Sequence, residues 1–184
     1  MAGKFDPQNA QNLKEIEKQF AVKAVEQAQT YWNLLEKVSP RELKLTQHDD
    51  DIFNDTKKTF PELFENDNAK LIKLDENFLK SEDGKKKWRA FHALSLVNSA
   101  CVRYEKKIKE HNFGCLIRTD ADGEYGETST IFVTRMQFYA IEISRNRLGL
   151  NDKAHEIAKE EAAKEAAKKE KEAKTSSKKT NGGK

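Results

Sequence analysis

The densest group of potential metal ligands in the chain is His48-Asp49-Asp50-Asp51. Hard cations such as calcium take several oxygen ligands, but calcium-binding loops space those ligands alternately around a glycine. This run does neither, and no second cluster of carboxylates or histidines lies near it in the sequence. Asp49 instead follows Thr46 at the spacing of a capping box, and acids in a first turn are favoured by the helix dipole. We therefore expect a helix start here and no metal site.

Nucleophilic catalysis and cofactor binding find no support in the motifs. Cys101 and Cys115 have no CxxC spacing, and neither lies at a nucleophile-and-base spacing from any of the four histidines. The phosphate-binding patterns GxxxxGKS, GxxxxGKT and GxGxxG are absent, and Gly123 and Gly126 lie in an acidic turn that would repel phosphate. We expect a protein that is not an enzyme and that uses no cofactor.

A basic stretch beside an aromatic residue, Lys85-Lys86-Lys87-Trp88-Arg89, has two interpretations. Trp88 could anchor a partner while the lysines steer an acidic surface. Large aromatic side chains more often stabilise a core, so packing of Trp88 inside the domain is favoured.

Four arginines gather around the end of the predicted domain: Arg118, Arg135, Arg145 and Arg147. They either form ion pairs with acids such as Glu142 and Glu124, or they build a surface that recognises carboxylates. The sequence does not decide between these arrangements.

Charge and composition divide the chain at residue 150. Residues 151–184 contain ten lysines, seven acids, no aromatic residue and one large aliphatic residue, Ile157, so they hold the whole net charge of +3. Such a segment buries too little apolar surface to offset chain entropy. Residues 1–150, which include the predicted domain at 6–150, have 24 basic and 24 acidic residues, so the domain gives little long-range attraction for nucleic acid. We expect no specific nucleic-acid binding, and a monomer.

Neither a membrane nor the secretory pathway is indicated. No apolar run approaches the roughly 20 residues that cross a bilayer, and the N-terminal residues lack the apolar stretch of a secretory signal. Cys101 and Cys115 are most simply small buried hydrophobic residues in a reducing compartment. The cytoplasm is the expected location, with the nucleus as a second one.

The first half of the chain predicts helices. Apolar residues recur every three or four positions from Leu13 to Val38, in a helix that begins at Asp6-Pro7. A short helix should follow Pro40, and another should run from Thr46 to Pro61. Residues 65–77 are predicted as a loop with an extended piece at 71–74, before a helix over 82–110.

The second half changes period. Residues 115–118 and 129–133 favour β-strands and flank an Asp122-Gly123 turn, which predicts a small hairpin. A helix should follow over 135–148 and end at Gly149, although residues 138–143 also resemble a strand. The alanine-, glutamate- and lysine-rich residues 158–174 predict a helical spacer without a face to bury, followed by a disordered end. The fold class is therefore mainly α, with a small hairpin before the last helix of the domain.

Four segments together resemble one family: LKLTQHDDDIF at 43–53, KKKWRAF at 85–91, NFGCLIRTD at 112–120 and STIFVTRMQFYAIEISRNRLG at 129–149. They are similar, in this order, to the successive signatures of the polysaccharide biosynthesis domain-containing protein family, over roughly residues 13–150. Residues 92–103 depart from the pattern, because this connection looks longer than the family's usual one.

The resemblance implies that the chain is a dedicated chaperone of newly made translation elongation factor 1-alpha. It would bind the GTP-binding domain of that protein during or just after synthesis. The ribosome with its nascent chain is therefore a further expected partner. The family name implies instead a methyltransferase-like protein of polysaccharide biosynthesis, but the glycine-rich cofactor loop of such enzymes is absent here. Motif position then suggests these partner-contacting residues: Asp49, Asp50, Trp88, Arg118, Arg135, Arg145 and Arg147.

Overall fold

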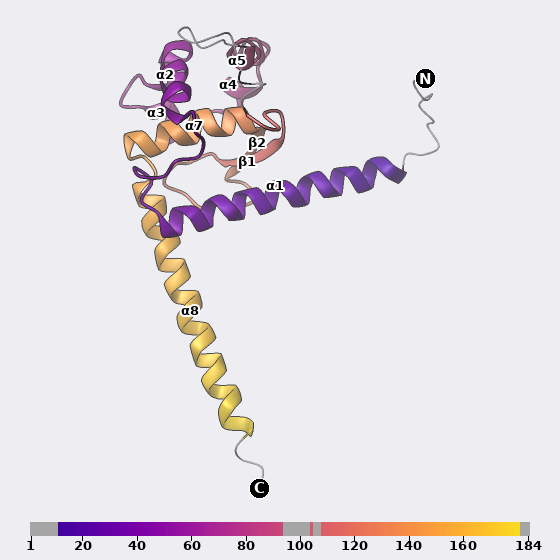
Figure 1. The fold of residues 1–184 in the computed structure, drawn as a ribbon, viewed down its shortest axis with the longest axis vertical. Coiled ribbons are helices and arrows are strands. Elements are labelled where there is room, and N and C mark those ends of the chain that lie inside the picture. Colours follow the sequence, from indigo (N-terminus) through magenta and orange to yellow (C-terminus); the bar gives the residue numbers. More distant parts are fainter. Residues whose placement is uncertain (1–10, 94–103, 105–107, 181–184) are drawn as a thin grey trace.

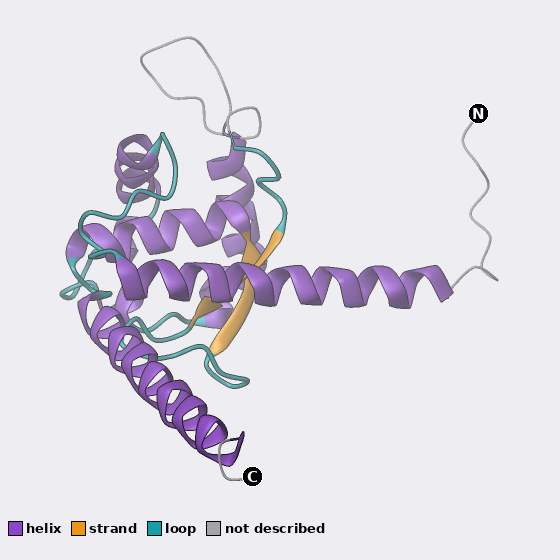
Figure 2. Cartoon of the chain, turned by 60° about the horizontal axis from the view of Figure 1, so that its bottom comes forward, coloured by secondary structure: helices purple, strands orange, loops and turns teal. Residues whose placement is uncertain are grey.

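The computed structural model describes residues 11–93, 104 and 108–180. The first helix, α1 (Gln11–Lys37), crosses the body, and its first turns project beyond the body (Figures 1 and 2). The predicted start at Asp6-Pro7 lies outside the described residues. Among the residues of the predicted apolar stripe whose side chains are described, Ala24, Ala28, Tyr31 and Leu35 are buried, whereas Phe20 is 50% exposed. Half of the helix therefore anchors to the core.

Short helices occupy the region between α1 and the hairpin: α2 (Asp49–Thr59), the 3-10 helix η2 (Pro61–Leu63), α3 (Ala69–Ile72), α4 (Glu76–Lys80) and α5 (Glu82–Ala93). Before α2, the Asp49 carboxylate accepts hydrogen bonds from the backbone N–H groups of Leu45 and Thr46, at 2.9 and 2.7 Å. These bonds order the turn before α2, but the N-cap of α2 is His48, which makes no side-chain cap hydrogen bond, so the capping box predicted with Thr46 as N-cap is wrong. The segment after Pro40 is a hydrogen-bonded turn rather than the predicted short helix.

Two other predictions in this region need correction. The expected extended piece at 71–74 is half helical, because Leu71 and Ile72 belong to α3 and only Lys73 forms an isolated bridge, with Asp120. Of the helix expected over 82–110, the structure describes α5 and the helical residue Tyr104, since residues 94–103 and 105–107 lie outside the described part. Residues 108–112 form bends and turns instead of a helix end.

The predicted hairpin and the helix that follows it are confirmed. Strand β1 (Gly114–Arg118) pairs antiparallel with β2 (Thr130–Thr134), and Leu116 lies opposite Phe132. Helix α7 (Arg135–Leu148) begins with a capping box between Thr134 and Gln137 and ends at Gly149, which has a left-handed φ of 72°. The strand interpretation of residues 138–143 is therefore wrong. Cys115 is fully buried in β1, as expected, while Cys101 lies outside the described residues.

An aromatic cluster joins the short helices. The ring of Phe60 stacks on that of Trp88 at a centroid distance of 4.2 Å and lies 5.5 Å from the ring of Phe91. Phe91 in turn lies 5.7 Å from Tyr104, whose hydroxyl donates to Asp55 at 2.7 Å. Aromatic pairs in these geometries stabilise a core beyond the area that they bury.

The last helix, α8 (Asp152–Thr180), corrects the expectation of a tail without a buried face. Ala154 and Ala158 are buried against the domain, and the Trp32 indole N–H donates to Glu161 at 3.0 Å. Only beyond these turns does α8 leave the body (Figure 1). The packed domain therefore extends past residue 150, and the tail is helical to Thr180. The mainly α fold with one hairpin is as predicted, and none of the described helices is long and apolar enough to span a membrane.

Candidate functional site

Two arginines of the predicted contact set lie in a fully buried charge cluster. Arg145 donates to one carboxylate oxygen of Glu142 at 2.7 Å, and Arg118 approaches the other at 3.4 Å. That second oxygen also accepts from the Tyr31 hydroxyl and from the Asn151 amide, each at 2.8 Å. The cluster joins β1, α7, α1 and the start of α8. Of the two arrangements open to these arginines, ion pairing therefore holds for Arg118 and Arg145.

The cluster is arranged to keep Glu142 ionised. Burial alone would raise the pKa of Glu142, but attraction to Arg118 and Arg145 outweighs burial and lowers it below the ordinary value of 4.5. Burial and the Glu142 charge raise the pKa of Tyr31 well above its ordinary value, which keeps that hydroxyl a donor. The arginines satisfy further groups, since Arg118 donates to the Ala121 carbonyl and Arg145 to the Leu71 carbonyl. These contacts stabilise the fold, and among the described residues only Arg118 Nε and Asn146 Nδ2 of this cluster have no hydrogen-bond partner.

Acidification should remove the contribution of Glu142 to stability. Because the folded-state pKa lies below 4.5, the unfolded chain takes up the proton first as the pH falls. The contribution is complete above the unfolded-state value and is lost as the pH falls through 4.5 toward the folded-state pKa. In urea unfolding, the difference in unfolding free energy between wild type and Glu142→Gln should shrink as the pH falls below 4.5. A difference that stays constant from about pH 7 to about pH 3 would contradict this assignment.

The other predicted contact residues do not form one surface. Asp50 pairs with Arg147, which lies over the Phe53 ring near the end of α7. Arg135, at the start of α7, pairs with Glu110 at 2.9 Å and lies over the Phe113 ring. Asp50 and Arg147 are exposed and Arg135 is half-buried. These three residues can reach a partner, but from opposite ends of α7.

Asp49 and Trp88 are buried and have structural contacts. Asp49 is 5% exposed and orders the loop before α2 through its hydrogen bonds to Leu45 and Thr46. Trp88 is 3% exposed and packs in the aromatic cluster, which agrees with the favoured interpretation. Neither side chain is available to a partner in this structure.

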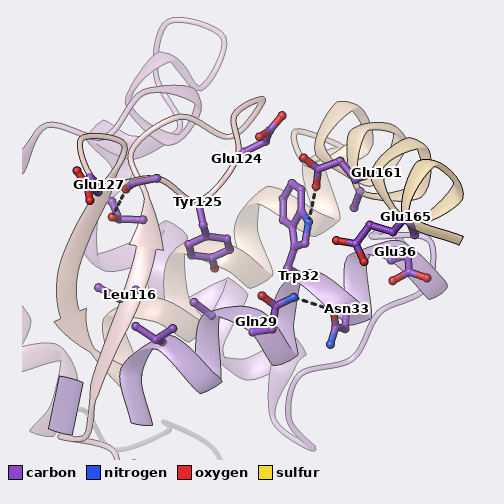
Figure 3. Close-up of a pocket in the computed structure, with 16 residues that line it drawn as sticks. Gln29, Trp32, Asn33, Glu36, Leu116, Glu124, Tyr125, Glu127, Glu161 and Glu165 are labelled. Carbon is purple, nitrogen blue, oxygen red and sulfur yellow. Dashed lines mark hydrogen bonds between the residues drawn. The ribbon is translucent and has the colours of Figure 1, made fainter. Parts of the chain in front are cut away.

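The sequence did not reveal an open groove of about 540 Å³ between α1, the loop that joins the strands, and α8. Figure 3 shows the rings of Trp32 and Tyr125 next to each other in this groove. Their centroids lie 6.0 Å apart at an interplanar angle of 87°. The buried Arg118 guanidinium lies 5.6 Å from the Trp32 ring and 5.8 Å from the Tyr125 ring. The buried charge cluster therefore supports the aromatic walls from inside.

Acids surround these rings. The groove is lined by five glutamates and by no lysine, arginine or histidine: Glu36, Glu124, Glu127, Glu161 and Glu165. They come from three segments that are far apart in the sequence. The sequence shows an acidic turn at 120–127 and places the two groove acids of α8, Glu161 and Glu165, four residues apart. Neither pattern indicates that these segments meet in space.

An apolar edge continues from the groove along α1 and the hairpin. We use this name for the exposed residues Phe20, Val25 and Phe132, which are 50%, 58% and 53% exposed, with Phe113 and Leu116 beside them. The rings of Phe20 and Phe113 lie 6.0 Å apart, and the Phe132 ring covers Gly114, where a Cβ atom would meet it at 2.0 Å. Val25 and Leu116 also line the groove, so the two surfaces are continuous.

Within the described residues, no group of three or more histidine, cysteine or acidic side chains is placed to hold a metal ion. What the surface offers is a groove and an apolar edge, both suited to non-covalent contact. Comparison with known sequences adds the family. The profile of the family described as "PBDC1 protein" matches residues 16–156.

The chain belongs to the PBDC1 family. Over 152 residues it is 51% identical to the PBDC1 homolog of Schizosaccharomyces pombe, which covers 83% of this chain and 96% of that protein. The homolog of Saccharomyces cerevisiae is 48% identical over 80% of this chain and 94% of its own length. Human PBDC1 is 39% identical over 76% of this chain but only 54% of the human protein.

A solved structure supports the PBDC1 fold. The solution NMR structure of protein yst0336 from Saccharomyces cerevisiae is 46% identical and superimposes with a TM-score of 0.67. The similarity covers 82% of this chain and 96% of that one. The family match to residue 156 includes the first turn of α8, in agreement with its packing on α1.

Proposed function

We propose that this PBDC1 protein is a non-enzymatic, ATP-independent holding chaperone that acts in the cytoplasm. Its proposed client is the GTP-binding domain of newly synthesised translation elongation factor 1-alpha, as the family resemblance implies. The single observation that supports a holding role is the apolar edge, because a folded domain rarely leaves neighbouring large apolar side chains half exposed without a partner.

The apolar edge would act by covering apolar surface that a folding client exposes. Burying each of its half-exposed side chains would contribute on the order of 1 kcal/mol. Charged residues around it would set the rate and orientation of encounter rather than most of the affinity. Phe20 is half exposed and precedes the buried residues of α1, which begin at Ala24, so a client could contact this side chain without disturbing the core.

Capture from a cell lysate tests the client and the edge together. The full chain should enrich translation elongation factor 1-alpha over a control of residues 151–184 alone, as read by mass spectrometry. The double variant Phe20→Ser, Phe132→Ser should retain about tenfold less, because it removes two apolar contacts. Leu34→Ser is the matched control, since Leu34 is an exposed apolar residue of α1 that lies nine positions beyond Val25.

Two outcomes would count against this function. Enrichment of no translational GTPase over the 151–184 control would reject the client. Equal loss in the edge variant and in the matched control would reject the edge as the contact surface. The methyltransferase alternative gains no support from the described residues, whose two strands form an antiparallel hairpin rather than the parallel strand and glycine-rich turn that hold a nucleotide cofactor.

A further inference from the structure

We propose that the groove between α1, the strand-connecting loop and α8 binds an extended polypeptide segment that carries lysine or arginine side chains. This inference rests on the groove itself and stands apart from the identity of the proposed client. It assigns a surface and a partner chemistry to residues that lie largely outside the predicted contact set. Only Arg118, from beneath the aromatic walls, is shared with that set.

The charge of the groove is not compensated locally. Glu161 accepts the hydrogen bond from Trp32, and Glu165 has Lys169 at 3.9 Å, with both side chains more than three-quarters exposed. Such an exposed pair contributes little. Glu36, Glu124 and Glu127 have no ion pair within the described part of the chain. A cluster of acids in a domain without net charge attracts cationic groups.

The walls of the groove suit long basic side chains. The stems of lysine and arginine pack along apolar surface while their charged ends reach acids. Trp32 and Tyr125 provide that apolar surface between α1 and the loop, and the acids stand around them (Figure 3). Arg118 already lies within 6 Å of both rings from inside, at 5.6 and 5.8 Å. The rings therefore act as packing walls for the stems, and the glutamates select the charge.

Shape and continuity favour a polypeptide over a small cation. The volume of about 540 Å³ exceeds what one side chain fills, and the groove is open rather than enclosed. Val25 and Leu116 carry its lining onto the apolar edge, where Phe132 lies opposite Leu116 in the hairpin. In a segment with alternating basic and apolar residues, the basic side chains would contact the glutamates and the apolar side chains would contact the apolar edge.

Binding of a labelled peptide to the full chain tests the assignment. The probe is a short peptide in which every second residue is lysine and the residues between are serine or leucine. The control peptide carries glutamate in place of each lysine. We expect saturable binding of the lysine peptide by fluorescence anisotropy, a weaker affinity between about 0.05 M and about 0.5 M salt, and no binding of the glutamate peptide. Tryptophan emission should respond through Trp32, because Trp88 is only 3% exposed.

Matched glutamine variants locate the site. Glu124→Gln, Glu127→Gln and Glu165→Gln together should weaken the lysine peptide about tenfold, by the loss of three exposed ion pairs. Glu42→Gln, Glu65→Gln and Glu156→Gln together should bind like wild type, because these exposed acids lie outside the groove. All six are surface positions, and circular dichroism should show both triple variants folded.

Several results would overturn the proposal. These are equal binding of the two peptides, affinities of the two triple variants within about twofold of each other, or displacement of the peptide by spermine at equal concentration. Dimerisation of the chain that competes with the peptide would assign the groove to a second copy instead. No elongation factor is present in this assay, so its failure leaves the proposed client untouched, and failure of the lysate capture leaves the groove untouched.

Discussion

Replacing Glu142 by alanine should lower the free energy of unfolding by about 3–5 kcal/mol. The change removes the only acid that the structure shows between the buried Arg118 and Arg145, whose side chains have no exposed surface. Two guanidinium groups would then remain buried beside each other without a counter-charge. The Tyr31 hydroxyl and the Asn151 amide would lose the same acceptor. Loss of one partner from a buried charge network is among the most destabilising single changes.

Urea unfolding at neutral pH measures this loss. Glu142→Gln should cost less than Glu142→Ala, because the amide keeps one acceptor oxygen and fills the same volume. Glu156→Ala is the matched control: it removes an exposed glutamate from α8 and should change stability by less than about 0.5 kcal/mol. An unfolding free energy of Glu142→Ala within about 1 kcal/mol of wild type would show that the arginines reach solvent or another acceptor.

The elements that sequence predicted best are those whose signals are local. The hairpin lies within one or two residues of its predicted bounds, because β-favouring runs flank a turn that only a few residues need to form. Helix α7 has the predicted bounds, since Gly149 can take the left-handed conformation that ends it. Both signals are complete within about 20 residues of sequence, so no distant segment had to be known.

Contacts between distant segments could not be predicted in the same way. Ala154 and Ala158 look like ordinary residues of a solvated alanine-rich helix, because alanine adds little to a hydrophobic pattern. Their burial depends on close approach to α1, which begins more than a hundred residues earlier. The groove also depends on contacts between distant segments, since its lining residues come from α1, the hairpin loop and α8. None of these segments alone predicts a groove.

The partner contacts suggested from motif position include both buried structural residues and accessible ones. Of the residues suggested as partner contacts, Asp49, Trp88, Arg118 and Arg145 are buried, while Asp50, Arg135 and Arg147 can reach solvent. Charged residues are rarely buried without partners, so a sequence alone favours a surface place for arginine. The paired acid, Glu142, lies 24 positions from Arg118 and could not be distinguished from other acids.

Arg118 links the buried charge cluster to the groove. Its guanidinium takes part in the buried cluster through Glu142 and Asn151, and it also lies beneath the rings of Trp32 and Tyr125. The charge network therefore holds both the core and the walls of the groove. Glu142 compensates one of the two buried guanidinium charges, while the groove acids Glu124, Glu127 and Glu165 are exposed to solvent, where a ligand can reach them.

Replacing Trp88 by alanine should lower the free energy of unfolding by about 3–5 kcal/mol, whereas Trp88→Phe should cost much less. The indole stacks on Phe60 and meets Phe91 edge-on at 5.6 Å, so alanine leaves a cavity in the cluster that joins the short helices. Its indole N–H has no hydrogen-bond partner among the described residues, and phenylalanine removes that buried donor while it fills most of the volume.

Urea unfolding of both Trp88 variants beside Phe132→Ala checks this order. Phe132 is also aromatic but is 53% exposed, so its loss should cost less than about 1 kcal/mol. If Trp88 acts only in the core, Trp88→Phe should still capture the client from a lysate as wild type does. A folded Trp88→Phe protein that loses the client would restore Trp88 to the contact surface, and equal stability losses for the alanine and phenylalanine variants would contradict the cavity argument.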